Sequence, residues 1–233
     1  MLLPDKNNNN DDLNMNSNEN INNQTTATRK DFQIARRLFH LSVGLIVGTV
    51  YGYFLNHQQA VYILGSGLCI LYIFEQVRIN YPKLAEKIAP VSKFIYRAEE
   101  QLKESASIPM IMGILLTILS FPKSFALTAI YTLAVADPMS AIFGIGFGKH
   151  HIVKDKSVEG SLAFFICSLA ICLFVYQSFG NSYSTSLFIY SFIYALGITA
   201  FEMIPLKLDD NLTIPLASAG YQWIMVALFG ISF

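Results

Sequence analysis

The sequence predicts an all-α integral membrane protein, a polytopic helix bundle of about seven spans with one interfacial amphipathic helix and a disordered N-terminal tail. Its 233 residues are 53% hydrophobic and 14% charged, whereas a soluble domain carries roughly 25% charged residues. The apolar residues gather in seven runs, and the basic residues gather in every second loop between them. These observations exclude an ordinary soluble globule, and the net charge of +0 gives no sign of a nucleic-acid partner. The expected surroundings are a lipid bilayer.

Residues 1–31 are expected to form a disordered tail in front of a membrane domain of residues 32–233. The stretch 7–23 contains 10 Asn and almost no apolar side chains. Ordering such a segment would cost conformational entropy without burying apolar surface in return. The tail is therefore predicted to take no part in the fold.

Seven apolar runs follow the tail and are the predicted spans, because about 20 apolar residues cross a bilayer and shorter runs can do so where neighbours support them. The third and fourth runs are short and are separated only by Pro122 and Lys123. This spacing predicts a tight antiparallel pair, with the fourth helix continuing past Asp137. The runs are Leu38–Leu55, Ala60–Phe74, Ile108–Phe121, Ser124–Ala136, Ser161–Phe179, Ser186–Ile204 and Leu212–Phe233.

Lys and Arg residues fall almost entirely on one side of these spans. Fifteen of the 16 lie on the side that holds the N-terminus, and Lys123 is the one on the other side. Cytoplasmic loops are enriched in Lys and Arg. The N-terminus is therefore predicted to be cytoplasmic, in a bacterial inner membrane or a eukaryotic endoplasmic reticulum.

The loop after the second span carries a helical stripe of apolar residues, with Lys and Glu on its other faces. Pro90 is expected to kink this helix. It is predicted to lie along the membrane surface with its basic face toward the lipid headgroups. The stripe consists of Leu84, Ile88, Val91, Ile95, Ala98 and Leu102.

Polar and ionisable groups near membrane depth are costly and therefore mark candidate functional sites. Five such clusters lie at the predicted cytoplasmic ends of the spans. Simpler explanations exist for the first three: a basic membrane-edge anchor, an ion pair at a helix end and a surface salt bridge. The anchor leaves a histidine unexplained. These three clusters are Arg36-Arg37-x-x-His40-x-x-x-Gly44, Glu75-x-x-Arg78 and Arg97-x-x-Glu100.

The fourth cluster contains the parts that a polyphosphate site requires. These are backbone N–H groups near a helix start, lysine charges and an acid for Mg²⁺. Glycines also permit close helix packing, so a packing role with a basic loop is the alternative. The cluster reads Asp137-x6-Gly144-x-Gly146-x-Gly148-Lys149, then Lys156-Ser157-x-Glu159-Gly160-Ser161.

The fifth cluster is acidic. Glu202 lies inside the sixth apolar run, where a carboxylate suggests a cation or a basic partner. Asp209, Asp210 and Asn211 precede the last span, and Asp210 or Asn211 can cap that helix. The outer halves of the spans are nearly all apolar, which argues against a transport path through them.

Taken together, the clusters resemble the motifs of the CTP-dependent lipid-alcohol kinases, the group of dolichol kinase, phytol kinase and yeast-type diacylglycerol kinase. That group shares a membrane superfamily with phosphatidate cytidylyltransferases. The resemblance runs from Arg36 to Pro215. Ser140, Asp155 and Ser157 depart from the family pattern, which usually has Ala, Lys and Thr there. The matching residues are Arg36, Arg37, His40, Gly44, Arg97, Glu100, Asp137, Gly144, Gly148, Lys156, Glu159, Gly160, Ala163, Glu202, Asp210, Asn211 and Pro215.

The resemblance implies that the hydroxyl of a membrane lipid alcohol attacks the γ-phosphate of CTP, giving a lipid phosphate and CDP. Polyprenol or dolichol, phytol and diacylglycerol are the acceptors of the family. Mg²⁺ is expected on Asp137, with Asp210 or Glu202 as a second acid. The general base is left open between His40 and Asp210. The residues expected to bind the nucleotide are Arg36, Arg37, Gly144, Gly148, Lys149, Lys156, Ser157, Glu159, Gly160 and Ser161.

Two other functions compete with the kinase. A phosphatidate cytidylyltransferase would make CDP-diacylglycerol and pyrophosphate from the same nucleotide, but the C-terminal His-Gly-Gly-x-x-Asp-Arg-x-Asp pattern of the bacterial enzymes is missing. A non-enzymatic lipid-binding protein or transporter is the second alternative. The product formed from CTP distinguishes the three.

Overall fold

A computed structural model describes residues 37–81, 107–153 and 156–229 of the chain. The predicted tail, the predicted amphipathic helix and the candidate residues Arg36, Arg97 and Glu100 lie outside these ranges. The chain divides into two units, residues 1–39 and 40–233.

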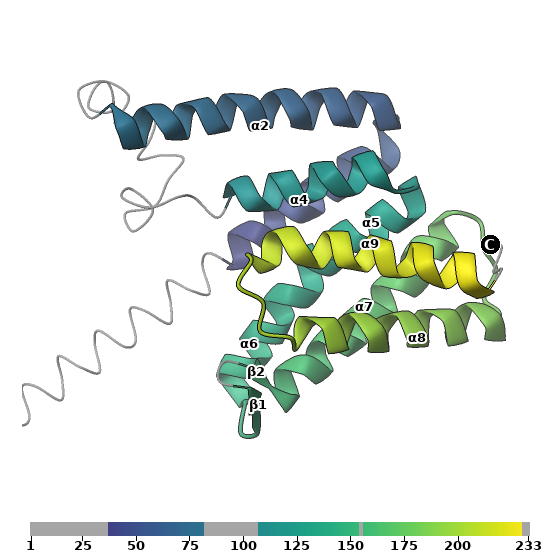
Figure 1. Cartoon of the computed structure of the whole chain (residues 1–233). Helices are drawn as coiled ribbons and strands as arrows, with labels where there is room; N and C mark the ends of the chain where they lie inside the picture. Colours follow the sequence, from purple (N-terminus) through teal and green to yellow (C-terminus); the bar gives the residue numbers. More distant parts are fainter. Residues whose placement is uncertain (1–36, 82–106, 154–155, 230–233) are drawn as a thin grey trace, which may run out of the picture. The chain divides into compact units, whose positions relative to one another are not determined.

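The described residues form seven helical segments, each overlapping one of the predicted runs (Figure 1). The all-helical prediction is therefore confirmed. The fourth helix does continue past Asp137, because α5, η2 and α6 follow one another without a break. The segments are a helix over 37–53, α2 (His57–Asn80), α4 (Ser107–Ser120), the joined α5 (Lys123–Tyr131), η2 (Thr132–Ala136) and α6 (Asp137–Phe147), α7 (Val158–Ser178), α8 (Thr185–Glu202) and α9 (Asp210–Phe229).

Five of these segments are long and apolar enough to cross a membrane, which marks the chain as an integral membrane protein. They are α2, the joined α5–η2–α6, α7, α8 and α9. Helix α4 is apolar but has only 14 residues, fewer than the roughly 20 that span the hydrocarbon core. A count of seven crossings therefore stays a prediction.

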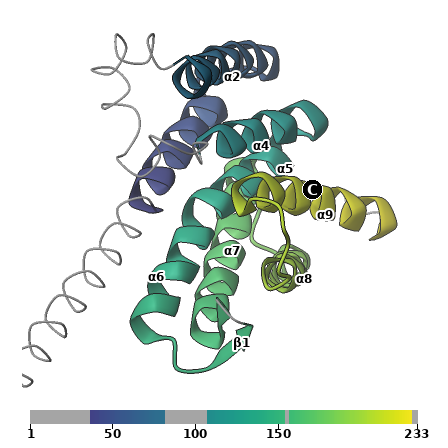
Figure 2. The same cartoon turned by 60° about the vertical axis from the view of Figure 1, so that its left-hand side comes forward.

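A small antiparallel β hairpin, which the sequence did not predict, joins α6 to α7. Strand β1 (His151–Val153) pairs with β2 (Lys156–Ser157), and His151 lies opposite Ser157. Strands this short show no alternating pattern that would separate them from a loop. Figures 1 and 2 show the hairpin at the ends of α6 and α7, which run side by side.

Several helices begin at side-chain caps that the sequence supplies. Asn56 and Gln59 form a capping box at the start of α2, and Ser184 accepts the Leu187 N–H at the start of α8. At α9 the cap is Asp209, whose Oδ1 accepts the Asn211 N–H at 2.9 Å. The expectation that Asp210 or Asn211 caps this helix was wrong. The side chain of Asp210 instead lies 3.7 Å from the ammonium of Lys156.

The interior of the bundle contains a buried set of hydrogen-bonded side chains. Tyr194 OH lies 2.9 Å from Thr132 Oγ1 and 2.6 Å from Ser218 Oγ. Tyr176 OH lies 2.9 Å from Tyr190 OH and also donates to Gln222. The expectation of nearly apolar outer halves was therefore wrong for α7, α8 and α9. Each of these polar groups has a partner on another helix, as a low-dielectric interior requires.

Candidate active site

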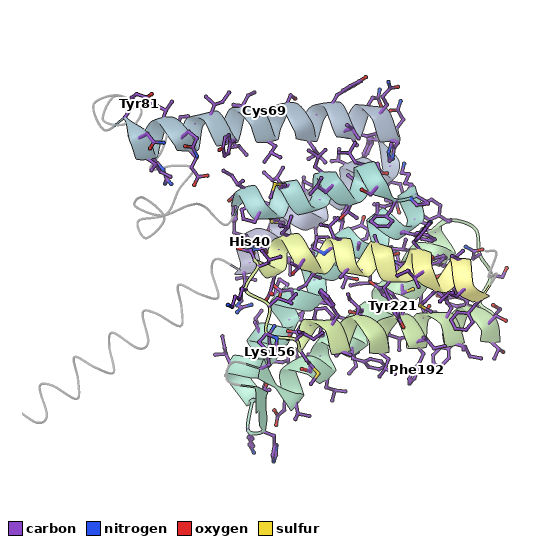
Figure 3. All side chains as sticks on the ribbon, in the orientation of Figure 1. His40, Cys69, Tyr81, Lys156, Phe192 and Tyr221 are labelled. Atoms are coloured by element: carbon purple, nitrogen blue, oxygen red, sulfur yellow. The ribbon has the colours of Figure 1, made fainter. Side chains whose placement is uncertain are left out.

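Lys156 is the residue on which the candidate site converges. It lies on β2, directly before the Ser157 cap of α7, and its side chain is 26% exposed. Its ammonium donates a hydrogen bond to Glu202 Oε1 at the end of α8 and lies 3.7 Å from Asp210 Oδ2 at the start of α9. Figure 3 shows Lys156 beside the loop that joins these two helices. The fold thus brings two carboxylates, 46 and 54 positions after Lys156 in the sequence, to one amine.

The surroundings keep Lys156 positively charged. Burial by itself lowers the pKa of its ammonium, but the hydrogen bond to Glu202 and the charges of Glu202, Asp210 and Asp137 together raise the pKa above 10.5. A raised pKa means that these interactions stabilise the fold at every pH below the ordinary value and are lost only as the pH rises through the raised one. At neutral pH the site therefore presents one cation surrounded by carboxylates.

Asp137 follows a turn of π-helix. Its N–H donates to the carbonyl of Thr132, five residues earlier, instead of four. Pro138 comes next and has no N–H to give to the preceding turn. A π turn adds one residue to a helical turn and often lies at a functional site. The hydroxyl of Thr132 is held in turn by Tyr194 of α8, so the turn that carries Asp137 is anchored to a second helix.

The predicted phosphate-binding glycines pack α6 against α7. A Cβ at Gly160 would lie 2.6 Å from Ser140 O, and one at Gly148 would lie 3.0 Å from Ser157 Oγ. The Gly160 N–H is already donated to Ser157 Oγ, and the Gly148 N–H to Gly144 O. The packing role that the sequence left open is therefore shown. A phosphate contact at these glycines stays a prediction.

Asp137 lies on the same stripe of α6 as these glycines. Residues three, seven and eleven positions apart share one face of a helix, and Ser140, Gly144 and Gly148 follow Asp137 at those intervals. Because Gly144 and Gly148 contact Ser157 of β2, this stripe faces the strand that carries Lys156. The arrangement agrees with the electrostatic action of Asp137 on Lys156.

His40 belongs to the same end of the bundle. The helix over 37–53 packs antiparallel against α5 and η2, so that a glycine one turn earlier on this helix meets a residue about one turn later on its partner. Extending the register by one turn brings His40 level with Asp137. The contacts of a Cβ added at each glycine are Gly52 with Leu127 at 3.7 Å, Gly48 with Tyr131 at 2.7 Å and Gly44 with Ala134 at 2.6 Å.

Three other predicted site residues, Glu75, Arg78 and Glu159, form ion pairs elsewhere. Glu75 and Arg78 form a buried ion pair of 3.2 Å at the end of α2, a helix whose other residues are mostly exposed. Glu159 pairs with His150, Nδ1 to Oε1 at 3.1 Å, and so ties the β hairpin to α7. Lys149 is exposed beyond the end of α6. The ion pairs of Lys156 with Glu202 and Asp210 do not include any of these residues.

The carboxylates fit a metal ion that arrives with a nucleotide. Within residues 37–81, 107–153 and 156–229, no three His, Cys, Asp or Glu side chains are grouped to hold a metal. Mg²⁺ on a nucleotide needs fewer protein ligands, since one or two carboxylates and the phosphates commonly hold it. Asp137 and Asp210 supply such carboxylates, and Glu202 Oε2 is buried with no hydrogen-bond partner among the described residues. Mg²⁺ at this site stays a prediction.

Sequence reasoning missed Thr132, Tyr194 and His150. Thr132 and Tyr194 are polar residues inside apolar runs, and a polar residue in such a run is a signal of a buried polar contact. The third stands next to Lys149 in a segment already singled out. Thr132 and Tyr194 are partners from distant parts of the chain, which a single sequence does not reveal, whereas the partner of His150 is Glu159, nine residues away.

The chain was compared with known proteins. It is 30% identical to an uncharacterized protein of Rickettsia prowazekii over 192 residues, which cover 80% of this chain and 91% of the relative. It is 26% identical to the CTP-dependent diacylglycerol kinase 1 of Schizosaccharomyces pombe, over 84% of this chain and 95% of that one. It is 29% identical to a probable chloroplastic phytol kinase 3 of Glycine max, over 84% of this chain and 64% of that one.

The chain belongs to the CTP-dependent lipid-alcohol kinase family. The diacylglycerol kinase 1 of Saccharomyces cerevisiae, 24% identical over 84% of this chain and 74% of its own length, supports the same membership. No protein-family model matches the chain, and no solved structure matches it. Family membership therefore rests on these relatives, and each similarity extends over most of this chain.

Proposed function

We propose that this protein transfers the γ-phosphate of CTP to the hydroxyl of a membrane lipid alcohol, giving a lipid phosphate and CDP. The observation that carries the proposal is the meeting of Lys156 with Glu202 and Asp210, within the electrostatic reach of Asp137. This cluster lies where membrane-length helices end, so a water-soluble nucleotide and a lipid can both approach it. The family relatives named for CTP and for lipid kinase activity support the same reaction.

Phosphoryl transfer asks a protein mainly to hold the reacting groups in line and to neutralise charge. Lys156 is proposed to hold a γ-phosphate oxygen, because its ammonium is charged and partly exposed. Asp137 and Asp210 are proposed to hold the nucleotide's Mg²⁺, which when bound would neutralise phosphate charge. The N-cap of α7 at Ser157 keeps Lys156 in place by fixing the strand that precedes the helix.

Four further residues of the predicted nucleotide site are proposed to contact CTP. Arg36 and Arg37 are basic residues whose guanidinium groups suit phosphate oxygens. Lys149 offers a further exposed charge beside the hairpin. Buried Ser161, in the first turn of α7, has a hydroxyl without a hydrogen-bond partner in the described structure and so offers a donor.

The experiment is a product assay with the full chain in membranes, supplied with CTP labelled on the cytosine and with each lipid alcohol in turn. Diacylglycerol, phytol and dolichol are the three acceptors to compare. We expect CDP and a phosphorylated lipid to appear together in equal amounts. With phosphatidate supplied in a separate reaction, pyrophosphate and CDP-diacylglycerol would instead show a cytidylyltransferase. A lack of turnover with all four lipids would contradict an enzymatic role. Vesicles without the protein give the background.

A further inference from the structure

Glu202 has two carboxylate oxygens in different surroundings. Its side chain is 1% exposed, and Oε1 accepts the hydrogen bond of Lys156. Oε2 is buried and has no hydrogen-bond partner in the part of the chain that the structure describes. Buried polar atoms are nearly always hydrogen-bonded, and an exception calls for an explanation such as a catalytic role or an absent ligand. A ligand with a donor group would explain it.

The surroundings indicate which kind of donor this is. Glu202 is the last residue of α8, an apolar helix of 18 residues whose outer face carries exposed Phe and Ile side chains. A membrane lipid can therefore reach the level of Glu202 along α8. Protein atoms cover the carboxylate itself, so water is largely excluded from it and a lipid hydroxyl reaches Oε2 as this cover moves aside. A neutral hydroxyl is a donor that enters such surroundings at a smaller desolvation cost than a charged group.

We propose that Glu202 is the catalytic residue that receives the lipid hydroxyl, by accepting its hydrogen bond at Oε2 and then its proton. The inference rests on the proposed function and adds the acceptor half of the same site. In the step, the hydroxyl oxygen forms a bond to the γ-phosphorus, and the bond from that phosphorus to the β–γ bridging oxygen breaks. CDP leaves with the electron pair, and the hydroxyl proton passes to Glu202.

Lys156 connects the part of the site proposed for the lipid hydroxyl with the part proposed for the phosphates of CTP. An ammonium has three N–H donors, and one of them is engaged by Glu202 Oε1. The remaining donors can hold a phosphate oxygen while the bond to Glu202 persists. The acceptor oxygen and the phosphate are thereby held on either side of one amine, which is the proximity that transfer requires.

The same geometry separates Glu202 from the metal. A divalent cation on Glu202 would lie next to the Lys156 ammonium that is hydrogen-bonded to the same buried carboxylate, and like charges repel strongly in a low-dielectric interior. Asp210 can hold a cation more easily, because it lies 3.7 Å from that ammonium and its side chain is 52% exposed. Asp210 is less suited to the lipid hydroxyl, because its side chain is 52% exposed and water competes for it. Glu202 and Asp210 contact the same lysine, so a variant at Asp210 is the matched control for a variant at Glu202.

The test uses the full chain with Mg²⁺, CTP and the acceptor lipid that is active in the product assay. The variants are Glu202→Gln, which keeps the shape but not the basicity, and Glu202→Asp, which keeps the carboxylate one methylene farther back. Asp210→Asn is the matched variant at the other carboxylate. Two readouts are taken for each: kcat with the lipid, and equilibrium binding of labelled CTP with Mg²⁺ in the absence of lipid.

We expect Glu202→Gln to lower kcat by about 10²–10⁴-fold, the usual loss of a general base, with CTP binding changed by less than about threefold. Glu202→Asp should recover part of the lost turnover, so this variant also decides the case if Glu202→Gln is made in low amounts. Asp210→Asn should instead weaken CTP binding.

Three results would overturn the proposal. Near-normal kcat in Glu202→Gln would mean that the proton goes elsewhere. A loss of CTP binding as large as the loss of kcat would make Glu202 a metal or lysine partner only. Wild-type protein that forms no lipid-dependent CDP would remove the proposed function itself, and this inference with it. The first two results leave the proposed function intact, so the two failures are distinguishable.

Discussion

The hydroxyl of Tyr194 lies 2.9 Å from Thr132 Oγ1, and through this contact α8 holds the π turn that ends at Asp137. The same hydroxyl lies 2.6 Å from Ser218 Oγ, so α9 is joined to the turn as well. A π turn changes the direction of every side chain that follows it, because it adds one residue to the helical repeat. Tyr194 is therefore a positioning residue for Asp137.

Tyr194→Phe should lower the stability of the fold by about 0.6 kcal/mol for each hydrogen bond lost, the measured mean for hydrogen bonds between membrane helices, whose measured maximum is about 1.7 kcal/mol. It should also lower turnover by roughly tenfold and raise the Mg²⁺ concentration required, since a misplaced catalytic group costs rate. The control is Tyr176→Phe, which removes a buried hydroxyl 2.9 Å from Tyr190. A comparable change of Mg²⁺ dependence in the control would show that Tyr194 acts only through stability.

Asp137→Asn keeps the shape of the side chain but removes its charge. We expect turnover to fall by about 10²–10³-fold, the typical cost of one charge-stabilising contact. Lys156→Ala should act on the same step, so the double variant should lose less than the product of the single losses. CTP-dependent lipid phosphorylation measured against Mg²⁺ concentration tests this. The control is Lys207→Ala, at an exposed lysine. Near-normal activity of Asp137→Asn would mean that Asp137 does not hold the metal and that Glu202 and Asp210 are the next carboxylates to test.

Gly160→Ala should destabilise the α6–α7 pair. Its Cβ would come within 2.6 Å of Ser140 O, a backbone atom that has little room to move. Overpacking of this kind costs about 1–3 kcal/mol. Gly146→Ala is the matched control, because no atom lies within 4 Å of its added Cβ, and Ala in place of Gly stabilises a helix by roughly 0.5–1 kcal/mol. Thermal unfolding in detergent should shift in opposite directions for the two variants.

Single-cysteine labelling tests the orientation. In a variant without the native cysteines, a cysteine at exposed Lys207 should react only with reagents that reach the cytoplasm, because of the 15-to-1 division of basic residues. A cysteine at exposed Tyr183, in the loop before α8, should react from the other side. Labelling of both positions from one side would contradict the predicted topology.

Deletion of residues 1–28 should leave membrane insertion and lipid phosphorylation unchanged. The deleted stretch has almost no apolar side chains and holds none of the five clusters. Turnover per molecule is compared with the full chain at equal abundance. A large loss at equal abundance would mean that the Asn-rich segment takes part in the reaction.

The helices could be predicted because each is an apolar run bounded by short polar loops, a feature of local sequence. The continuation of the fourth helix past Asp137 was also predictable, since only Pro122 and Lys123 separate two short runs. The π turn was not, because it depends on the contact of Thr132 with Tyr194, 62 residues away. A tertiary contact of this kind leaves no periodicity in the sequence.

The site was predictable in its residue types more than in its contacts. Asp137, Lys156, Glu202 and Asp210 were all singled out, but their meeting at one amine depends on three separate helices. The cap of α9 was assigned to the wrong residue because consecutive polar residues, Asp209 among them, are equally good caps in sequence. Glycine leaves no side chain from which a packing role and a ligand-binding role can be told apart.

The buried hydroxyls and amide of the bundle also affect how the protein is made. Tyr176, Tyr194 and Gln222 lie on α7, α8 and α9, and each finds its partner on a different helix. A helix that enters the bilayer before its neighbours leaves these groups unpaired in hydrocarbon. We therefore expect the last three helices to leave the translocon as a group. Chains shortened before Gln222 should then be degraded by membrane quality control even though their remaining helices are apolar.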